Sequence, residues 1–335
     1  MGYNGAMEPS QATKNPLDGR WTFLSMAAAV IAGMASLLLF LAPSDIVEAF
    51  QATGVSGLRV SIAFFFIGCW LTVERWRANL NFRVGRTECA HSMGVAHAGN
   101  LLIPGRVGEP LRVFALARLG VCPEVGTSAL VQERLLDQVL RVVFVGLSLL
   151  IVGASFGGDL AQKLLLTASL AVIGLAGSVL LVRSRVSVSQ RVGVWAGFIP
   201  RVRTETVSRY LLSTLDDLAD NWSSSGSRKA VLWAFLAWLV FSVHYLAVLK
   251  LFFPERTLAM CFLMMAFSPV TAPTQPGVYH AMIAGALMML GADKVPAIQV
   301  SVVLHMIQMV GFALWGGLSW VLLHRRAIES VPAQA

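Results

Sequence analysis

Charged side chains are scarce in this sequence. Lys, Arg, Asp and Glu make up 13% of its 335 residues, whereas 56% are hydrophobic and the mean hydropathy is +0.69. A soluble globular domain carries about 25% charged residues, so this composition excludes an ordinary soluble domain. The apolar residues fall in long blocks such as 21–42 and 231–253, and about 20 apolar residues are enough to cross a hydrocarbon core. Because these blocks do not alternate, we expect membrane-spanning helices.

Cysteines and catalytic signatures are also few. The four cysteines stand at positions 69, 89, 122 and 261, without the spacing of metal ligands or of a disulfide framework. The sequence holds no phosphate-binding loop, no dinucleotide-binding glycine pattern and no His-Glu-x-x-His motif. We therefore expect no metal site, no cofactor and no enzymatic activity.

The net charge of +8 is distributed as in a membrane protein and not as in a nucleic-acid-binding protein. Basic residues flank the apolar blocks, as in 75–86 and in the polar loop 183–229, which is typical of cytoplasmic flanks. Block 21–42 is too long for the core of a signal peptide, so we expect a retained first span behind a tail over residues 1–20. We predict a bacterial inner-membrane protein with both termini in the cytoplasm, ending in a tail over 326–335.

Proline and glycine interrupt the apolar pattern in two stretches, 88–118 and 258–291. Full spans are expected over residues 21–42, 58–74, 128–155, 164–182, 230–253 and 295–323. If each broken stretch enters and leaves on one side as a helical hairpin, every arginine-rich flank becomes cytoplasmic. The integral membrane domain, 21–325, then consists of two halves, 21–155 and 164–323, with inverted topology. The alternative is eight or ten ordinary spans with proline kinks.

The first broken stretch carries polar residues that favour an anion. One stretch of 13 residues contains both the expected chain reversal and five polar or helix-breaking candidates: Asn100, Pro104, Arg106, Glu109 and Arg112. Proline and glycine free backbone N–H groups there, and the arginines add cations that suit phosphate or carboxylate. Charge at membrane depth marks a pathway or a binding site by default. The alternative is a cytoplasmic loop whose charges are solvated and pair with one another.

A second polar cluster opens the span over 128–155. Glu133 and Asp137 are four residues apart, so they share one helical face, and Arg134 lies one turn from Asp137. We expect this face to meet the first broken stretch, with pairs such as Arg106 to Glu133 or Arg112 to Asp137. The alternative is an interfacial helix end with weak local ion pairs.

The second broken stretch includes Pro276, Gly277, Tyr279 and His280. Its hydroxyl and imidazole groups could hold a head group, and His280 could titrate near neutral pH. Proton coupling through His280, Glu133 or Asp137 is a further hypothesis. The alternative is that His280 is a hydrogen-bonded packing residue.

These motifs together resemble the lysylphosphatidylglycerol synthase transmembrane region, a flippase-like family. The resemblance covers roughly residues 55–325 and rests on Asn100-x3-Pro104-Gly105-Arg106-x-Gly108-Glu109-x2-Arg112, Glu133-Arg134-x2-Asp137, the Trp76 region and the turn Pro276–Tyr279. It implies lipid handling, because in the aminoacyl-phosphatidylglycerol synthases this domain moves modified lipid between leaflets. Relatives are linked to hopanoid transport or accompany glycosyltransferases.

Two departures from that family limit what the resemblance implies. Only a short tail follows the last span, so no aminoacyltransferase domain and no aminoacylation of lipid are expected. His280 also stands where the family usually has an acidic residue after the Pro-Gly turn.

The leading hypothesis is a lipid or lipid-linked-molecule translocase that recognises an anionic or polar head group. Its substrate-binding residues would be Asn100, Pro104, Arg106, Glu109, Arg112, Glu133, Arg134, Asp137, Pro276, Gly277, Tyr279 and His280. Its expected partners are a membrane lipid and the bilayer, and no nucleic acid is expected. Two alternatives stay open. One is a membrane-embedded enzyme, or an accessory subunit of a lipid-synthesis enzyme. The other is a scaffold that recruits a partner through loop 183–229, where one surface helix is expected over 205–222.

Overall fold

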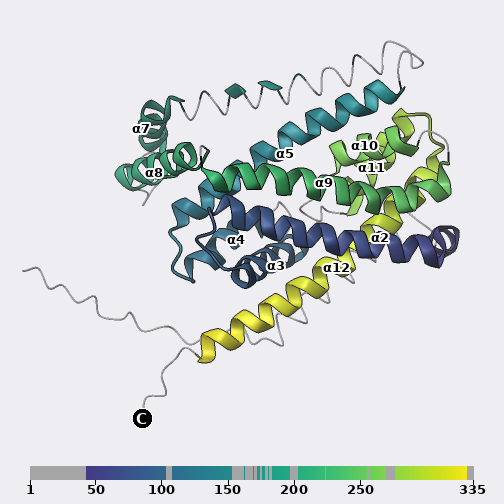
Figure 1. The fold of residues 1–335 in the computed structure, drawn as a ribbon, viewed down its shortest axis with the longest axis horizontal. Helices are drawn as coiled ribbons and strands as arrows, with labels where there is room; N and C mark the ends of the chain where they lie inside the picture. The colour runs from purple at the N-terminus through teal and green to yellow at the C-terminus, as the bar shows by residue number, and fades with distance from the viewer. Residues whose placement is uncertain are drawn as a thin grey trace, which may run out of the picture.

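The computed structural model describes residues 43–102, 108–152, 183–196, 203–222, 224–254, 257–268 and 276–329, with isolated positions between 162 and 180. In this described part every regular element is an α-helix (Figure 1), which confirms the all-α class predicted from the composition. The expected first span, 21–42, lies outside the described residues, and so does most of the expected fourth span, 164–182.

Capping, proline and glycine residues mark several helix ends and one kink. In chain order they are α2 (Pro43–Asn79), α3 (Arg86–Leu102), α4 (Gly108–Ala117), α5 (Pro123–Val152), α7 (Arg185–Ala196), α8 (Thr204–Trp222), α9 (Ser225–Phe252), α10 (Thr257–Phe267), α11 (Pro276–Met289) and α12 (Lys294–Glu329). The Ser224 hydroxyl caps α9 by accepting a hydrogen bond from the Ser227 amide, and Pro254 follows its last turn. Gly54, at φ +65°, allows a kink near the start of α2.

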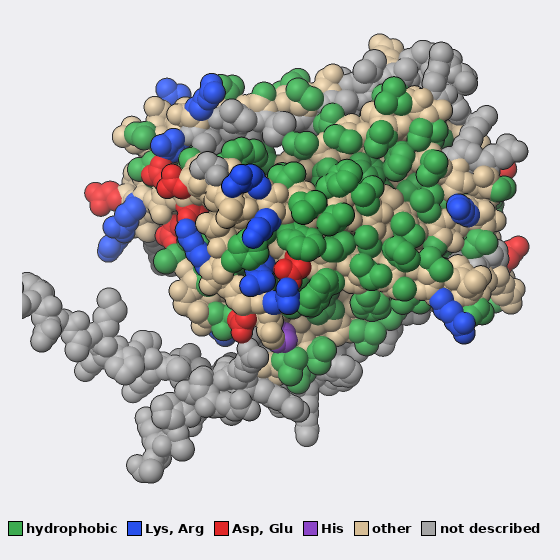
Figure 2. Space-filling view, in the orientation of Figure 1, with side chains coloured by type: hydrophobic (Ala, Val, Ile, Leu, Met, Phe, Trp, Pro, Cys, Tyr) green, Lys and Arg blue, Asp and Glu red, His purple; other side chains and the backbone are tan. Residues whose placement is uncertain are grey.

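Several of these helices have the length and composition of membrane spans. The segments Gly54–Asn79, Ser225–Phe252 and Lys294–Leu322 are long and apolar enough to cross a bilayer, and α10 and α11 are shorter apolar helices. The face over α2 and α9 is mainly hydrophobic, whereas Lys and Arg side chains gather near α7 and α8 (Figure 2). The protein is therefore a multi-pass membrane protein.

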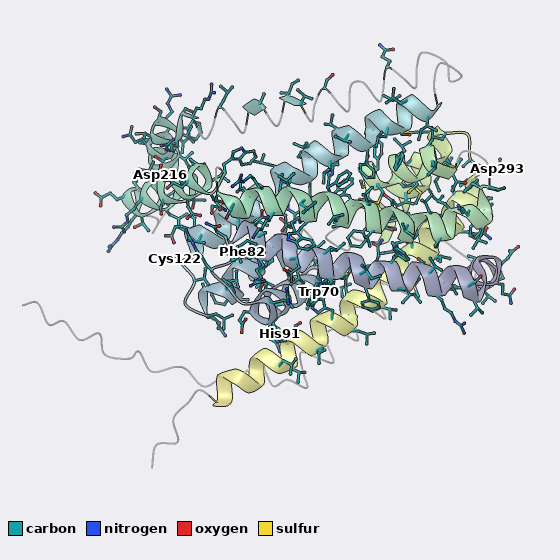
Figure 3. The ribbon with its side chains drawn as sticks, in the orientation of Figure 1. Trp70, Phe82, His91, Cys122, Asp216 and Asp293 are labelled. Carbon is teal, nitrogen blue, oxygen red and sulfur yellow. The ribbon has the colours of Figure 1, made fainter. Side chains whose placement is uncertain are left out.

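The long helices run roughly along one axis, with α2 and α12 directed toward α7 and α8 and with α5 and α9 directed away from them (Figure 1). The C-terminal ends of α2 and α12 and the N-terminal ends of α5 and α9 point toward α7 and α8, and we call this the α8 end. Figure 3 places Cys122 and Asp216 at the α8 end and Asp293 at the opposite end. The surface helix expected over 205–222 is confirmed as α8, whereas α7 was not predicted.

Both broken stretches form helical hairpins, α3–α4 and α10–α11, which lie toward opposite ends of the long axis (Figure 1). Each hairpin packs against the last long helix of the other half, since α3 contacts α12 and α10 contacts α5. The two halves also meet through α2 and α9. An inverted repeat predicts such reciprocal packing. The repeat itself stays a prediction, because part of each half lies outside the described residues.

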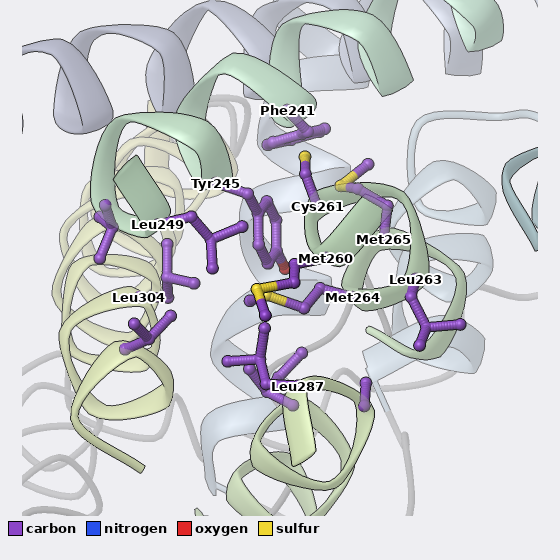
Figure 4. Packing of buried hydrophobic residues seen from close by; sticks show 14 of the residues in the cluster. Phe241, Tyr245, Leu249, Met260, Cys261, Leu263, Met264, Met265, Leu287 and Leu304 are labelled. Carbon is purple, nitrogen blue, oxygen red and sulfur yellow. The ribbon is translucent and has the colours of Figure 1, made fainter. Parts of the chain in front are cut away.

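Close packing holds the bundle together. Tyr245, Met260, Met264, Leu287 and Leu304 pack in a core shared by α9, α10, α11 and α12 (Figure 4). Small residues bring the backbones close: a Cβ at Gly68 of α2 would lie 2.7 Å from the Phe241 ring of α9. A Cβ at Gly316 of α12 would lie 2.9 Å from the Ala98 Cβ of α3. Van der Waals packing of this kind drives helix association where lipid offers no hydrophobic contrast.

Candidate functional site

A buried ionic cluster joins α2, α4 and α5. Arg75 of α2 places Nη1 at 2.7 Å from Asp137 Oδ1 and Nη2 at 3.2 Å from Glu133 Oε1. Arg112 of α4 donates from Nη1 and Nη2 to Glu133 Oε1, each at 3.2 Å, and from Nη1 to Oε2 at 3.3 Å. The side chains of Arg75, Arg112 and Glu133 are at most 4% exposed, so water does little to screen these charges.

Arg134 of α5 forms the more accessible edge of the cluster. Its guanidinium lies 3.1 Å from Glu133, 3.3 Å from Asp137 and 3.3 Å from Glu109 of α4. The side chains of Arg134 and Glu109 are 23% and 19% exposed. We name the six residues the Arg-Glu cluster: Arg75, Glu109, Arg112, Glu133, Arg134 and Asp137. Its three carboxylates balance its three guanidinium groups.

Neighbouring side chains fix the positions of the charges. The Arg112 guanidinium carbon lies 3.8 Å from the centre of the fully buried Trp76 ring, within the range of a cation–π interaction. The indole N–H of Trp238, from α9, donates to Asp137 Oδ1 at 3.3 Å. These aromatic groups come from α2 and α9, so the cluster depends on the contact between the two halves.

The α3–α4 hairpin is held in shape by Asn100 and Gly108. The Asn100 Oδ1 accepts a hydrogen bond of 2.8 Å from the Gly108 amide, which satisfies one free N–H at the start of α4. The α-carbon of Gly108 lies so close to the Ala96 carbonyl that an added Cβ would overlap it. This approach brings Glu109 and Arg112 beside α3.

A small pocket lies against the cluster. It is lined by Met93, Ala96, His97, Asn100, Glu109, Arg112 and Arg134, and its free volume is about 10 Å³. This is the scale of one water molecule, so the site is closed to a lipid head group in this conformation. The His97 ring, which lines the pocket, stacks on Phe312 of α12 with 3.9 Å between ring centroids and an interplanar angle of 15°.

Buried charges of this kind have a functional implication. Desolvating them costs several kcal/mol per ion, and replacement of a buried ionic group by apolar residues is often neutral or stabilising. Stability alone is therefore a weak explanation for Arg75, Arg112 and Glu133. At membrane depth such groups mark binding sites and transport pathways. Guanidinium groups that already make forked contacts to carboxylates can make them to phosphate as well.

The structure brings together most of the residues predicted in the first half. Glu109, Arg112, Glu133, Arg134 and Asp137 form the cluster, and Asn100 supports it. Pro104 and Arg106 lie outside the described residues, so the proposed pair of Arg106 with Glu133 does as well.

The predicted partner of Arg112 was wrong. Arg112 pairs with Glu133, whereas Asp137, one helical turn further along α5, is paired with Arg75 and Arg134. The physical reason is that the C-terminal end of α2 packs against α5 and places Arg75 beside Asp137. By sequence alone Arg75 looks like a membrane flank, because the apolar block ends just before it.

Arg75, Trp76, His97 and Trp238 were missed as candidate site residues. For Arg75 and Trp76 a signal existed, because they adjoin each other at the end of a long apolar block. His97 and Trp238 gave no local signal, since their roles depend on α12 and α5.

The second predicted segment forms a separate polar cluster. Pro276 and Gly277 begin α11, Tyr279 is buried, and His280 is hydrogen-bonded to Ser301 and His305 of α12. Among the described side chains of this second segment, none lines the pocket beside Arg112.

One motif was overlooked in the sequence. Residues 153–157 spell Gly-x-Ser-x-Gly, the letters of a hydrolase nucleophile elbow. That elbow requires a strand before the serine and a helix after it. Here the motif follows helix α5 directly and lies outside the described residues, so it lacks the preceding strand.

The helical architecture, apolar surface and buried ionic cluster define a polytopic membrane protein with a candidate site for a charged group. Residues 25–316 match the lysylphosphatidylglycerol synthase TM region. This match covers most of the chain, so the protein belongs to that family, and the resemblance seen in the sequence is confirmed. No curated protein and no solved structure gives a significant match. Family membership supports a lipid-related function in the membrane.

Proposed function

We propose that this protein moves a lipid with an anionic head group, or a lipid-linked molecule, between the leaflets of the bacterial inner membrane. The observation that carries the proposal is the Arg-Glu cluster, in which Arg112 and Arg134 border a pocket on a helical hairpin. Membership of a lipid-related membrane family supports the same substrate class.

Phosphate is the head-group chemistry that the cluster fits best. A guanidinium presents paired donors that match two oxygens of a phosphate. Arg112 Nε has no hydrogen-bond partner among the described residues, although its other nitrogens bind Glu133. A phosphate in the pocket would therefore find one free donor and would compete with Glu133 for the rest. This competition keeps binding reversible, because the carboxylate recovers the arginine when the lipid leaves.

Translocation requires the pocket to open. Its present free volume of about 10 Å³ holds no phosphate, so the conformation described is a closed one. The α3–α4 hairpin is the element that must move, since it contributes Glu109 and Arg112 and packs on both α5 and α12. The acyl chains would stay in the bilayer while the head group crosses beside the hairpin.

The orientation follows from charge. Lys and Arg gather at the α8 end (Figure 2), and basic flanks favour the cytoplasm. We therefore assign the α8 end, both chain termini and the pocket side of the α3–α4 hairpin to the cytoplasmic face.

Leaflet exchange in proteoliposomes tests the proposal. Fluorescent phosphatidylglycerol is incorporated, and its accessibility to dithionite reports exchange between leaflets. The protein should accelerate exchange without altering the lipid chemically. The R112Q/E133Q double variant removes a cation and an anion together, so the cluster keeps its charge balance. Its exchange rate should fall about 10- to 100-fold, because hydrogen bonds to charged groups contribute about 1.5–3 kcal/mol.

The matched control is R209A, which removes an exposed arginine of α8 outside the cluster. It should exchange lipid at the wild-type rate. A chemically changed lipid would instead favour a membrane-embedded enzyme. Wild-type protein that neither exchanges nor modifies lipid would favour an accessory or scaffold role.

A further inference from the structure

A pair of histidines lies inside the second half of the bundle. His305 is fully buried within the candidate span Lys294–Leu322, and its Nδ1 lies 3.1 Å from Nε2 of His280 on α11. The Tyr279 ring stacks on the His305 ring at 4.4 Å and 20°. His280 belongs to the α10–α11 hairpin, from which the Arg-Glu cluster takes no residue, and His305 belongs to α12.

The hydrogen bonds around the pair assign its protons. Ser301 has one hydroxyl proton, and it donates this proton to the Ile298 carbonyl at 2.6 Å. The 2.8 Å contact between His280 Nδ1 and Ser301 Oγ therefore requires a proton on His280 Nδ1. In a neutral His280 the other nitrogen, Nε2, is then an acceptor, so His305 must donate to it from Nδ1.

This assignment leaves one open position. A neutral His305 that carries its proton on Nδ1 has a lone pair on Nε2. That atom is buried and has no hydrogen-bond partner among the described residues. A buried acceptor without a partner is costly, and such groups in native structures call for an explanation.

A proton is the ligand that fits this position. A proton delivered by a hydronium ion forms an N–H bond at His305 Nε2, and the Nδ1 proton of His305 passes to His280 Nε2. His280 then carries the positive charge and donates from both nitrogens, to Ser301 and to His305. The water molecule stays behind, and loss of the Nε2 proton reverses every step. No heavy atom has to move, since the contact between the imidazoles only reverses direction.

The surroundings suit a histidine pair that is uncharged before it binds the extra proton. Within the described residues no Asp, Glu, Lys or Arg side chain pairs with either imidazole. The Tyr279 ring packs against both imidazoles, stacked on His305 with 4.4 Å between ring centroids and edge-to-face with His280 at 5.7 Å. The titratable groups near the pair on the packed elements include Tyr279 of α11, Cys261 of α10, and Tyr245 and His244 of α9. His97 of α3 lies two turns along α12, at Phe312.

We propose that the His280–His305 pair is a proton-binding site and that its protonation couples lipid translocation to a proton gradient. This inference rests on the proposed function and adds its energy source. Buried histidines of membrane proteins serve as proton relays when their two nitrogens face different partners.

His305→Asn separates the proton-binding role from a packing role. The Asn amide nitrogen takes the position of Nδ1 and keeps the donation to His280, but no acceptor replaces Nε2. His244→Asn is the matched control. It alters another buried histidine with an unpartnered Nε2, whose Nδ1 contacts the Ser61 carbonyl at 2.9 Å, but which has no second imidazole beside it.

Proteoliposomes holding fluorescent phosphatidylglycerol provide the assay, with the membrane potential clamped by potassium and valinomycin. For one proton per lipid, a gradient of one pH unit should accumulate the lipid about tenfold in one leaflet. His305→Asn should still equilibrate the leaflets without accumulating lipid, and a trapped pH dye should record no lipid-dependent proton flux. His244→Asn should behave as wild type.

Nitrogen NMR of histidine-labelled protein in the same vesicles gives a readout independent of transport. At neutral pH both His280 and His305 should carry their proton on Nδ1, and acidification should produce one imidazolium that His305→Asn abolishes. Protons on Nε2 at neutral pH, or a pair that stays neutral on acidification, would overturn the proposal. Wild-type exchange that ignores the gradient overturns the coupling alone, whereas absence of any exchange overturns the proposed function and the coupling with it.

Discussion

The Arg112 guanidinium lies 3.8 Å above the Trp76 ring while its donors bind Glu133. Trp76 is fully buried near the end of α2, and Arg112 belongs to the hairpin that follows. The Trp76 indole of α2 thus holds the Arg112 guanidinium of α4 in position. This contact joins a fixed span of the bundle to the hairpin that must move in the proposed cycle.

Trp76→Leu should reduce leaflet exchange. A desolvated cation–π contact contributes about 2 kcal/mol, so we expect the rate to fall about tenfold or more, and Trp76→Phe to fall less because it keeps an aromatic face. The dithionite assay measures both variants. Trp222→Leu, at a half-exposed tryptophan of α8, is the control and should exchange lipid normally. Equal rates for Trp76→Leu and the wild type would show that the indole does not position Arg112.

The Arg75–Asp137 pair should behave as a coupled unit. Arg75→Met alone leaves two carboxylates with one cation fewer, and loss of one partner from a buried pair costs about 3–5 kcal/mol. Asp137→Asn added to Arg75→Met should recover about 1–3 kcal/mol of the summed loss. Reversible unfolding in mixed micelles measures this cycle. Arg75→Met combined with Arg209→Ala should be additive, and additivity in the Arg75–Asp137 cycle as well would contradict the paired arrangement.

Gly108→Ala should disrupt the hairpin. The added Cβ would overlap the Ala96 carbonyl, which is backbone and cannot rotate away, so α3 and α4 must separate. We expect a loss of stability of about 1–3 kcal/mol, as overpacking produces, together with loss of lipid exchange. Thermal unfolding in detergent measures the first effect.

Gly146→Ala is the matched control for that variant. A Cβ at Gly146 of α5 meets nothing within 4 Å, and alanine is the better helix former by about 1 kcal/mol. It should leave stability unchanged or raise it. A Gly108→Ala protein as stable as Gly146→Ala would mean that the hairpin is more loosely packed than its backbone contact indicates.

The two hairpins should be labelled from opposite sides of the membrane. Pro110 of α4 and Val278 of α11 are exposed, so a cysteine at either position can react with a membrane-impermeant maleimide. In a Cys122→Ser background, which removes the exposed native cysteine, P110C should react from the cytoplasmic side and V278C from the outside. Reaction of both from the same side would exclude the inverted arrangement of the halves.

Much of the architecture could be predicted from local sequence. Long apolar blocks with few charges indicate membrane helices, and the proline and glycine positions marked both hairpins before any contact was known. The spacing of Glu133 and Asp137 placed them on one helical face, which faces the α3–α4 hairpin and the end of α2. Such features follow from helix geometry and from the cost of placing charge in lipid, and both act within a short stretch of chain.

Partner choice within the site could not be predicted in the same way. Arg112 pairs with Glu133 because the end of α2 inserts Arg75 beside Asp137, a contact between residues 62 positions apart. His280 gave a titration hypothesis from its residue type, but its bond to His305 depends on how α11 packs against α12.

The Asn100–Arg112 and Pro276–His280 segments separate what the local sequence determines from what helix packing determines. The sequence by itself determined that both are polar interruptions of an apolar chain, because hydrophobicity and helix breaking are properties of neighbouring residues. Only the tertiary structure decided that Arg112 pairs with the acidic face of α5 beside a closed pocket, while His280 joins a separate histidine pair. Hydrogen bonds and ion pairs need groups within about 3 Å of each other, and helix packing sets that distance.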